Sequence, residues 1–355
     1  MTVILVVLII IAFAVEQWSI FNALKGIRIS YGPSIPLAAP DELFDLISNL
    51  SNRSRRLVPF IKAQEYLPPG MTLHSPAAKV RLDFKGDLQH TYTTFMMPRS
   101  TLRRSESASI SNRGRYLFNS ALLSGGDFLG LNEKTVRVSL FSEIVIYPRE
   151  NEAAKVREVL GGFLGDNSVR RFIMEDPVLT AGFRDYTGRE PMKSISWSQS
   201  ARAGKIMVRS FDYTTEPAVT VLLNVECDAD EYEKDRMEAL IENCYCITHT
   251  VCKVLEERKI KYDFYTNATS SGAFADWSYI AEGLGNKHFY TILEGMGRAS
   301  YRTTESFSSA IKRVESRGIN SLIIISPTDE RAVLPRLNRE IAGRSLIISA
   351  GSVES

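Results

Sequence analysis

The sequence predicts a membrane-anchored α+β chain: an N-terminal transmembrane helix, then an antiparallel β-sandwich, then a doubly wound α/β domain. Three observations lead to this fold class. They are an unbroken apolar run at residues 3–15, short alternating segments up to residue 147, and nearly continuous apolar runs among helical patterns after residue 217. The expected parts are the anchor at 1–24, the sandwich at 27–147, a connecting segment at 151–217 and the α/β domain at 218–355.

Residues 1–24 predict a single transmembrane helix. The run at residues 3–15 covers only about 20 Å as a helix, but its continuation to Leu24 gives roughly 33 Å, enough for a bilayer core of about 30 Å. No basic residue precedes the run and no small-residue cleavage site follows it, as a signal peptide would require. Lys25 and Arg28 follow the run, so the positive-inside rule predicts a single-pass protein of the cell membrane with the bulk of the chain in the cytoplasm. The alternative is a buried segment of an ordinary core.

Residues 27–147 alternate between apolar and polar positions in short segments. Such segments lie at 80–84, 90–97, 115–123 and 143–148, and glycines and prolines separate them. Strand-like runs at this spacing predict an antiparallel β-sandwich.

After residue 217 the pattern changes to that of an α/β domain. Residues 218–225 (AVTVLLNV) predict a strand covered on both faces, and residues 231–258 predict a helix with an apolar face of period 3.6. Helical patterns at 277–284, 306–317 and 329–341 alternate with strand patterns at 259–265, 321–326 and 345–350. In such sheets, ligands bind beyond the carboxyl ends of the strands.

Composition and motifs give little reason to expect catalysis. The 43 basic and 41 acidic side chains leave a net charge of +2, which argues against nucleic acid as a partner. The four cysteines crowd into residues 227–252, which suits free thiols. The sequence lacks the phosphate-loop, dinucleotide, nucleophile-elbow and zinc-protease motifs. We therefore favour a protein without enzymatic activity.

Residues 182–212, here called the signature segment, are dense in charged and aromatic side chains. On physical grounds the segment is a loop followed by a strand, and two interpretations are open. Its charged residues form an ion-pair network that fixes the indole of Trp197, or the segment is a docking surface. The network would comprise Arg184, Asp185, Arg189, Glu190 and Arg202.

The signature segment resembles that of the domain-of-unknown-function family 58. The matching positions are Arg184, Asp185, Tyr186, Gly188, Ile195, Trp197, Ser200, Ala201, Arg202, Gly204, Val208 and Phe211. Upstream, the residues at 113–118 (RGRYLF), 124–131 (SGGDFLGL) and 143–150 (EIVIYPRE) also resemble the family's motifs. The resemblance implies an α/β domain similar to a von Willebrand factor A domain, and a MoxR-type AAA+ ATPase as partner.

A magnesium site is one further implication of the resemblance. Von Willebrand factor A domains that bind Mg²⁺ carry an aspartate and two hydroxyl residues after their first strand. Here the corresponding residues run from Asn224 through Glu226 to Asp228, without the hydroxyls, and Asp329 follows a later strand. We expect no cofactor; Mg²⁺ held by Asn224, Glu226, Asp228 and Asp329 is the alternative.

The leading hypothesis is therefore a membrane-anchored scaffold or adaptor. Its cytoplasmic α/β domain would dock a MoxR-type ATPase or a client protein. The alternative is a hydrolase or a metal-dependent binding protein, with its site at the strand ends near Asp228 and Asp329.

Overall fold

The computed structural model divides the chain by its contacts into two compact units. The first comprises Met1–Arg149 with Met296–Arg298, and the second comprises Glu150–Gly295 with Ala299–Ser355. The residues that the structure describes are 23–74, 80–82, 88–126, 132–151, 153–171, 180–188, 192–211, 218–227, 233–272, 277–317 and 321–353, together with Ile4, Phe13, Ala14, Gln17 and Phe21.

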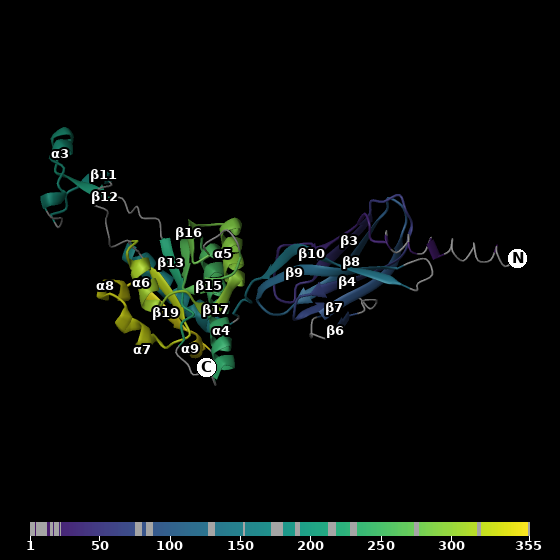
Figure 1. The fold of residues 1–355 in the computed structure, drawn as a ribbon. Helices are drawn as coiled ribbons and strands as arrows, with labels where there is room; N and C mark the ends of the chain where they lie inside the picture. The colour runs from purple at the N-terminus through teal and green to yellow at the C-terminus, as the bar shows by residue number, and fades with distance from the viewer. Residues whose placement is uncertain are drawn as a thin grey trace. The chain divides into compact units, whose positions relative to one another are not determined.

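The first unit contains two sheets (Figure 1). One is antiparallel, with the strand order β1 (Ile27–Pro33), β3 (Phe44–Asn52), β8 (Thr101–Ile110) and β5 (Met71–Leu73). The other has the order β2 (Leu37–Ala38), β10 (Glu133–Ile146), β9 (Gly114–Gly126), β4 (Val58–Leu67), β7 (Leu88–Met96) and β6 (Val80–Leu82). In this second sheet only the short β2 runs parallel to its neighbour.

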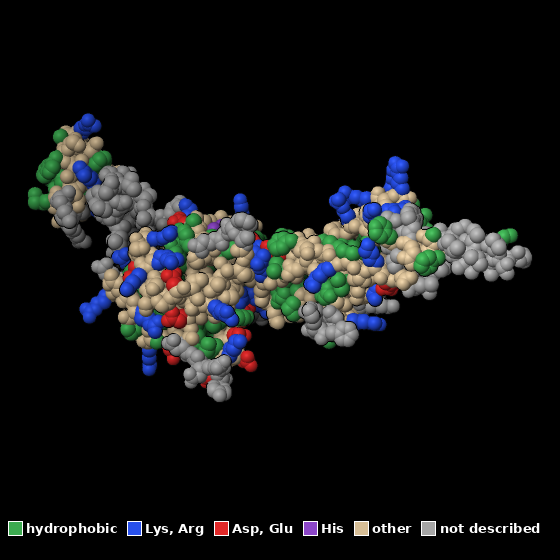
Figure 2. Space-filling model, viewed as in Figure 1, with side chains coloured by type: hydrophobic (Ala, Val, Ile, Leu, Met, Phe, Trp, Pro, Cys, Tyr) green, Lys and Arg blue, Asp and Glu red, His purple; other side chains and the backbone are tan. Residues whose placement is uncertain are grey.

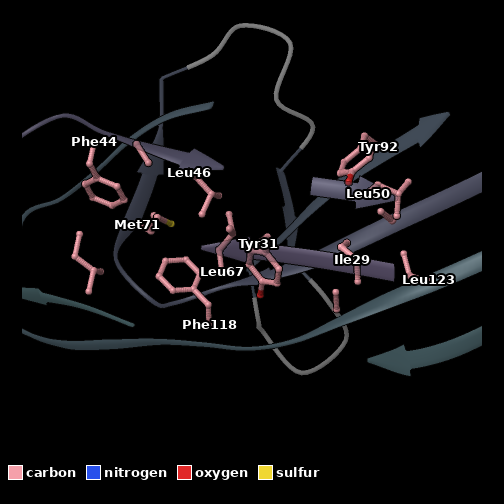
Figure 3. Packing of buried hydrophobic residues seen from close by; sticks show 14 of the residues in the cluster. Ile29, Tyr31, Phe44, Leu46, Leu50, Leu67, Met71, Tyr92, Phe118 and Leu123 are labelled. Atoms are coloured by element: carbon pink, nitrogen blue, oxygen red, sulfur yellow. The ribbon is translucent and has the colours of Figure 1, made fainter. Parts of the chain in front are cut away.

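Both sheets of the first unit contribute to one hydrophobic core (Figure 3). Along β3, every second residue from Phe44 to Asn52 is buried, because successive side chains of a strand point to opposite faces. Leu46 and Leu50 on this strand belong to the same buried cluster as Ile61 and Phe118 of the other sheet. The two sheets therefore enclose a shared apolar interior.

The second unit is built on a five-stranded sheet. Its order is β16 (Tyr279–Gly283), β14 (Lys261–Thr266), β13 (Ala218–Leu223), β18 (Leu322–Ser326) and β19 (Ser345–Ser349). All neighbours run parallel except β16, which pairs antiparallel with β14 at one edge. A separate two-stranded sheet joins β15 (Ala268–Ser270) and β17 (Ala299–Thr303).

Helices cover the five-stranded sheet and bury its central strands. The helix α6 (Phe307–Glu315) packs against Leu222 and Ile324 in one apolar cluster, and α4 (Lys234–Glu257) contacts β13, β14 and β18. The other helices described outside the signature segment are α2 (Ala154–Arg171), α5 (Asn286–Arg298), α7 (Glu330–Val333), α8 (Arg339–Ala342) and α9 (Ala350–Val353), and the last three residues of α5 are grouped with the first unit. Burial of β18 along its whole length explains its run of apolar residues.

The predicted transmembrane anchor is corrected by the structure. In the part of the chain that the structure describes, no helix combines the length and the apolar character needed to cross a membrane. The described helices α2 and α4 are long enough, but both carry charged side chains along their length. Most of residues 1–24 lie outside the described residues. The membrane-anchored fold class and the single-pass location at the cell membrane were therefore wrong as predictions.

Two helical predictions in the second unit also differ from the structure. Residues 277–284 contain the edge strand β16, because Ile280 pairs with Phe264 of β14 rather than continuing a helix. The single helix expected at 329–341 is split into α7, a 3₁₀ turn at Leu334–Arg336 and α8. Pro335 has no backbone N–H to continue the helical hydrogen bonds, which accounts for the break.

Candidate functional sites

Three polar side chains meet where neighbouring parallel strands of the second unit end. Asn224 follows β13, Asn267 follows β14 and Ser326 is the last residue of β18. All three are buried. Because the carboxyl ends of parallel strands lie at one edge of the sheet, these positions are adjacent although they are far apart in sequence.

The side chains at this edge form hydrogen bonds with one another. Asn267 Nδ2 donates to Asn224 Oδ1 at 2.8 Å, and Asn224 Nδ2 donates to Ser326 Oγ at 3.0 Å. The backbone N–H of Val225 donates to Asn267 Oδ1 at 2.9 Å, and that of Glu226 donates to Asn224 Oδ1 at 2.9 Å. Each amide oxygen therefore already accepts at least one hydrogen bond from within the chain.

The carboxylate of Glu226 is engaged with helix α6. Its Oε2 accepts a hydrogen bond from the backbone N–H of Phe307, the first residue of that helix, at 2.6 Å. Its Oε1 lies 3.5 Å from Nη1 of Arg336. A negative charge at a helix N-terminus is favourable, so the carboxylate of Glu226 links the end of β13 to the N-terminus of α6.

The described donors at the strand ends do not fit a magnesium ion. Mg²⁺ is bound through carboxylates in near-octahedral geometry, whereas the buried oxygens here belong to amides and hydroxyls that bind one another. Asp329 is exposed and, among the described residues, its side chain bonds to neither Asn224 nor Glu226. Asp228 lies outside the described residues. Within the described ranges, no group of three or more His, Cys, Asp or Glu residues is placed to hold a metal.

The signature segment forms a small folded element of its own. Its strands β11 (Thr180–Asp185) and β12 (Met207–Phe211) pair antiparallel. Between them lie a 3₁₀ turn (Met192–Ser194) and the helix α3 (Trp197–Ala203). The backbones of Ile195 and Val208 form an isolated β-bridge, and the side chains of both residues are buried.

Hydrogen bonds of two serines hold α3 against β12. Ser200 Oγ accepts from the backbone N–H of Met207 at 2.8 Å and donates to the carbonyl of Ser196 at 2.8 Å. The backbone N–H of Ser196 donates to the carbonyl of Met207 at 2.9 Å. Gly204 ends the helix with φ of 66°, a left-handed conformation that favours glycine, which explains this glycine of the signature.

Most of the predicted signature side chains are exposed. Trp197 is 64% exposed, while the predicted network around its indole stays a prediction, because two of its members lie outside the described residues. Asp185 pairs with Lys205 at 2.7 Å, and both are exposed. The other exposed signature residues are Arg184, Gly188, Ala201, Arg202 and Gly204, while Tyr186 is half-buried and Arg189 and Glu190 lie outside the described residues.

Several apolar side chains of the signature segment are exposed. Met192 is 71% exposed, and Phe183, Trp197 and Ile206 are also exposed. On the face shown in Figure 2, hydrophobic and basic side chains lie next to one another on this segment. Exposed apolar groups of this size on a folded element commonly mark contact surfaces.

A buried polar cluster in the first unit was not anticipated from the sequence. Glu65 on β4 lies opposite His90 on β7, with 3.2 Å between Oε2 and Nδ1. Ser48 donates to the other oxygen of Glu65 and lies 3.0 Å from the hydroxyl of Tyr92. The guanidinium of Arg104 lies 4.3 Å from the centre of the Tyr92 ring. The available signal was a glutamate in the apolar phase of the alternating segment around Ala63 and Leu67.

The cluster around Glu65 is buried, and we interpret its role as structural. Glu65 and His90 are almost completely buried, and Nε2 of His90 has no hydrogen-bond partner among the described residues. Burial, reinforced by the nearby charge of Glu65, raises the pKa of Tyr92 well above its ordinary value, so its hydroxyl stays protonated.

The cysteines are free thiols, as predicted. Cys244 and Cys252 are buried in α4, where desolvation raises the pKa of both thiols. A protonated, buried thiol is a poor nucleophile and a poor metal ligand.

Comparisons with known proteins find only distant similarity. No family model matches the chain, so the resemblance to the domain-of-unknown-function family 58 stays a prediction. The Uncharacterized protein YeaD of Bacillus subtilis is 25% identical over 144 residues, which make up 40% of this chain and 34% of that protein. The chain thus spans about a third of the length of the curated relative that it matches.

Solved structures with similarity to the chain cover about a third of it. The CARDB domain of the PF1109 protein from Pyrococcus furiosus is 13% identical, covers 32% of this chain and 86% of that chain, and has a TM-score of 0.21. The PapD-like domain of human CEP192 is 16% identical, covers 34% and 87%, and has a TM-score of 0.20. The GAE domain of GGA2p from Saccharomyces cerevisiae is 12% identical, covers 32% and 89%, and has a TM-score of 0.22. Similarity at this level carries no argument about function.

Proposed function

We propose that the protein is a non-catalytic adaptor that docks a protein partner through the exposed apolar side chains of its signature segment. The observation that carries the proposal is Trp197, a large side chain that is 64% exposed although its helix is held in place by Ser196 and Ser200. Tryptophan and methionine are enriched at the centres of protein interfaces, where their burial supplies much of the binding energy.

The strand ends offer less support for the alternative, a hydrolase or metal-dependent binding protein. The buried amides of Asn224 and Asn267 are engaged with each other, and the carboxylate of Glu226 binds α6. A general base needs a side chain that reaches a substrate, and none of these three groups is available in the described arrangement.

The partner that we propose is a MoxR-type AAA+ ATPase, or a client protein delivered to one. Support comes only from the resemblance of the signature residues. In this proposal the adaptor contributes a docking surface, and the ATPase contributes the nucleotide chemistry.

Binding of the full-length chain to the MoxR-type ATPase of its own organism tests this function. The dissociation constant is measured by biolayer interferometry for the wild type, for Trp197→Ala and for Phe141→Ala. Phe141 is the matched control, because it is an aromatic residue 74% exposed in the other unit. We expect Trp197→Ala to weaken binding by about tenfold or more and Phe141→Ala to leave it unchanged. Absence of binding, or equal binding by all three proteins, would overturn the proposal.

A further inference from the structure

Three segments of the first unit that carry basic but no acidic residues meet where β1, β4 and β8 begin and β3 and β7 end. They are residues 23–28, 51–58 and 95–101. The backbone N–H of Arg53 donates to the carbonyl of Gly26 at 2.9 Å, and that of Arg99 donates to the carbonyl of Ser54 at 3.0 Å. These bonds join the second segment to the other two, and we call the three together the loop surface.

A buried asparagine holds two of the segments in place. Asn52 is 1% exposed, and its Nδ2 donates to the carbonyl of Arg56 at 2.8 Å and to that of Met97 at 2.9 Å. Its Oδ1 accepts a hydrogen bond from the backbone N–H of Ser54 at 3.0 Å. The loop surface is therefore preorganised, which reduces the entropy that the binding of a partner would cost.

The loop surface concentrates positive charge. Its six basic residues are Lys25, Arg28, Arg53, Arg55, Arg56 and Arg99, and all but the half-buried Arg56 are exposed. Arg53, Arg55 and Arg99 form no ion pair with any residue in the described ranges. In the neighbouring hairpin of β9 and β10, whose Gly125 lies against Leu24, the described residues Glu133 and Lys134 add one charge of each sign. The described part of this end of the unit therefore has a clear excess of positive charge.

The same loops also expose apolar side chains. Leu57 directly precedes Val58, and Met97 directly follows Met96, the residue with which Val58 pairs between β4 and β7. The side chains of Val58 and Met96 are buried, whereas Leu57 is 44% and Met97 is 55% exposed, as expected where successive side chains alternate between two faces. The loop surface thus offers both cationic and apolar groups to a partner.

We propose that the loop surface binds a protein partner that presents carboxylates around an apolar contact area. A guanidinium matches a carboxylate with two parallel hydrogen bonds, and protein interfaces are enriched in arginine and methionine but depleted in lysine. The five arginines and one lysine of this surface follow that preference. Leu57 and Met97 offer no ring on which a nucleobase could stack, which makes a nucleic acid a poorer match.

This inference does not rest on the proposed function. The loop surface lies in the first unit, whereas the signature segment lies in the second. An adaptor with both surfaces would hold two partners, and loss of one interaction would leave the other in place.

The test uses three fluorescent helical peptides of equal length. The first carries leucines on one face and glutamates elsewhere, the second has alanines in place of the leucines, and the third has lysines in place of the glutamates. Binding to the full-length chain is followed by anisotropy at physiological ionic strength, where distant charges are screened. We expect the glutamate–leucine peptide to bind at least about tenfold more tightly than either of the others, because it alone matches both the charge and the apolar side chains.

Charge reversal locates the binding on the molecule. The triple variant Arg53→Glu/Arg55→Glu/Arg99→Glu should lose at least about tenfold in affinity for the glutamate–leucine peptide. It should also gain affinity for the lysine peptide, a gain that a simple loss of folding would not produce.

A matched control separates the loop surface from the total charge of the protein. The variant Arg302→Glu/Arg331→Glu/Arg339→Glu changes the net charge equally, through three exposed arginines of the second unit, and should keep the wild-type affinity. Equal losses in the two triple variants, equal binding of the two glutamate peptides, or binding of no peptide would overturn the inference. Binding of an oligodeoxythymidine strand or of phosphatidylserine vesicles in place of the peptide would overturn it as well.

Discussion

Asn267 donates its side-chain N–H to the side-chain oxygen of Asn224 at 2.8 Å, and this bond links the ends of two adjacent parallel strands. Both residues are buried, so neither amide can exchange this bond for one with water. Asn224 is also one of the residues to which the resemblance assigned a magnesium site, and its side-chain oxygen is engaged here by Asn267.

Truncation of one asparagine should therefore be costly. We expect Asn267→Ala to lower the free energy of unfolding by about 1–3 kcal/mol, because it leaves the oxygen of Asn224 and the N–H of Val225 short of a partner. Urea denaturation measures the change. In a double-mutant cycle with Asn224→Ala the two losses should be less than additive, since both variants break the same bond. Strict additivity would show that the amides act independently.

Magnesium should not stabilise the protein. A ligand that binds only the folded state raises the free energy of unfolding by RT ln(1 + [L]/Kd). Because the described oxygens at the strand ends are engaged with one another, we expect the thermal midpoint to be the same with added Mg²⁺ and with a chelator. A midpoint that rises with Mg²⁺ concentration, and does so less in Asp228→Ala, would restore the metal site.

The buried glutamate of the first unit should contribute strongly to its stability. Glu65→Ala is expected to lower the free energy of unfolding by about 3 kcal/mol or more, because it leaves His90 and Ser48 without their partner inside the core. Glu65→Gln, which keeps a carbonyl oxygen and the shape, should cost less. Lys62→Ala on the same strand, whose side chain is only half-buried, is the matched control. Urea denaturation measures the loss of unfolding free energy in each of the three variants. Equal losses in all three would exclude the role assigned to Glu65.

Glu150 should make stability depend on pH. Burial opposes its ionisation, but hydrogen bonds from Lys253 and Arg157 outweigh that effect and lower the pKa of Glu150 below its ordinary value of 4.5. A carboxylate with a lowered folded-state pKa stabilises the fold above its unfolded-state pKa, and this contribution is lost as the pH falls through the folded-state pKa.

The corresponding experiment compares wild type with Glu150→Gln by urea unfolding at several pH values. At neutral pH we expect the wild type to be more stable by a few tenths of a kcal/mol to about 1 kcal/mol, since the ion pairs are partly exposed. The difference should disappear on acidification well below pH 4.5. Glu158→Gln, on the exposed face of α2, should show no such dependence. A difference that persists in acid would point to packing rather than charge.

Local patterns predicted many individual elements, because the spacing of apolar residues along each element reflects which of its faces is buried. The apolar run at residues 218–225 contains β13, and the period of 3.6 in α4 matches its buried residues Ile241, Cys244, Val251 and Leu255. The edge strand β16 was predicted as a helix, since a short apolar run does not distinguish the two and its pairing partner lies on another strand.

The candidate sites depended on information that no local pattern contains. Asn224 and Asn267 are 43 residues apart, and only the parallel pairing of β13 and β14 makes them neighbours. The exposure of Trp197 also could not be read from its surroundings in sequence, where many charges suggested a closed network. The prediction of a membrane anchor was wrong, because an apolar composition does not by itself establish a spanning helix.

The hydrogen bonds that fasten α3 to β12 join residues that are close in sequence, such as Ser200 and Met207, seven positions apart. Closing such short loops costs little chain entropy, so this element can assemble early and without waiting for distant strands to pair. It can also be altered on its surface with little effect on how the five-stranded sheet folds. The segment thereby offers a portable part: transplanted between two strands of an unrelated scaffold, it should carry its binding preference with it.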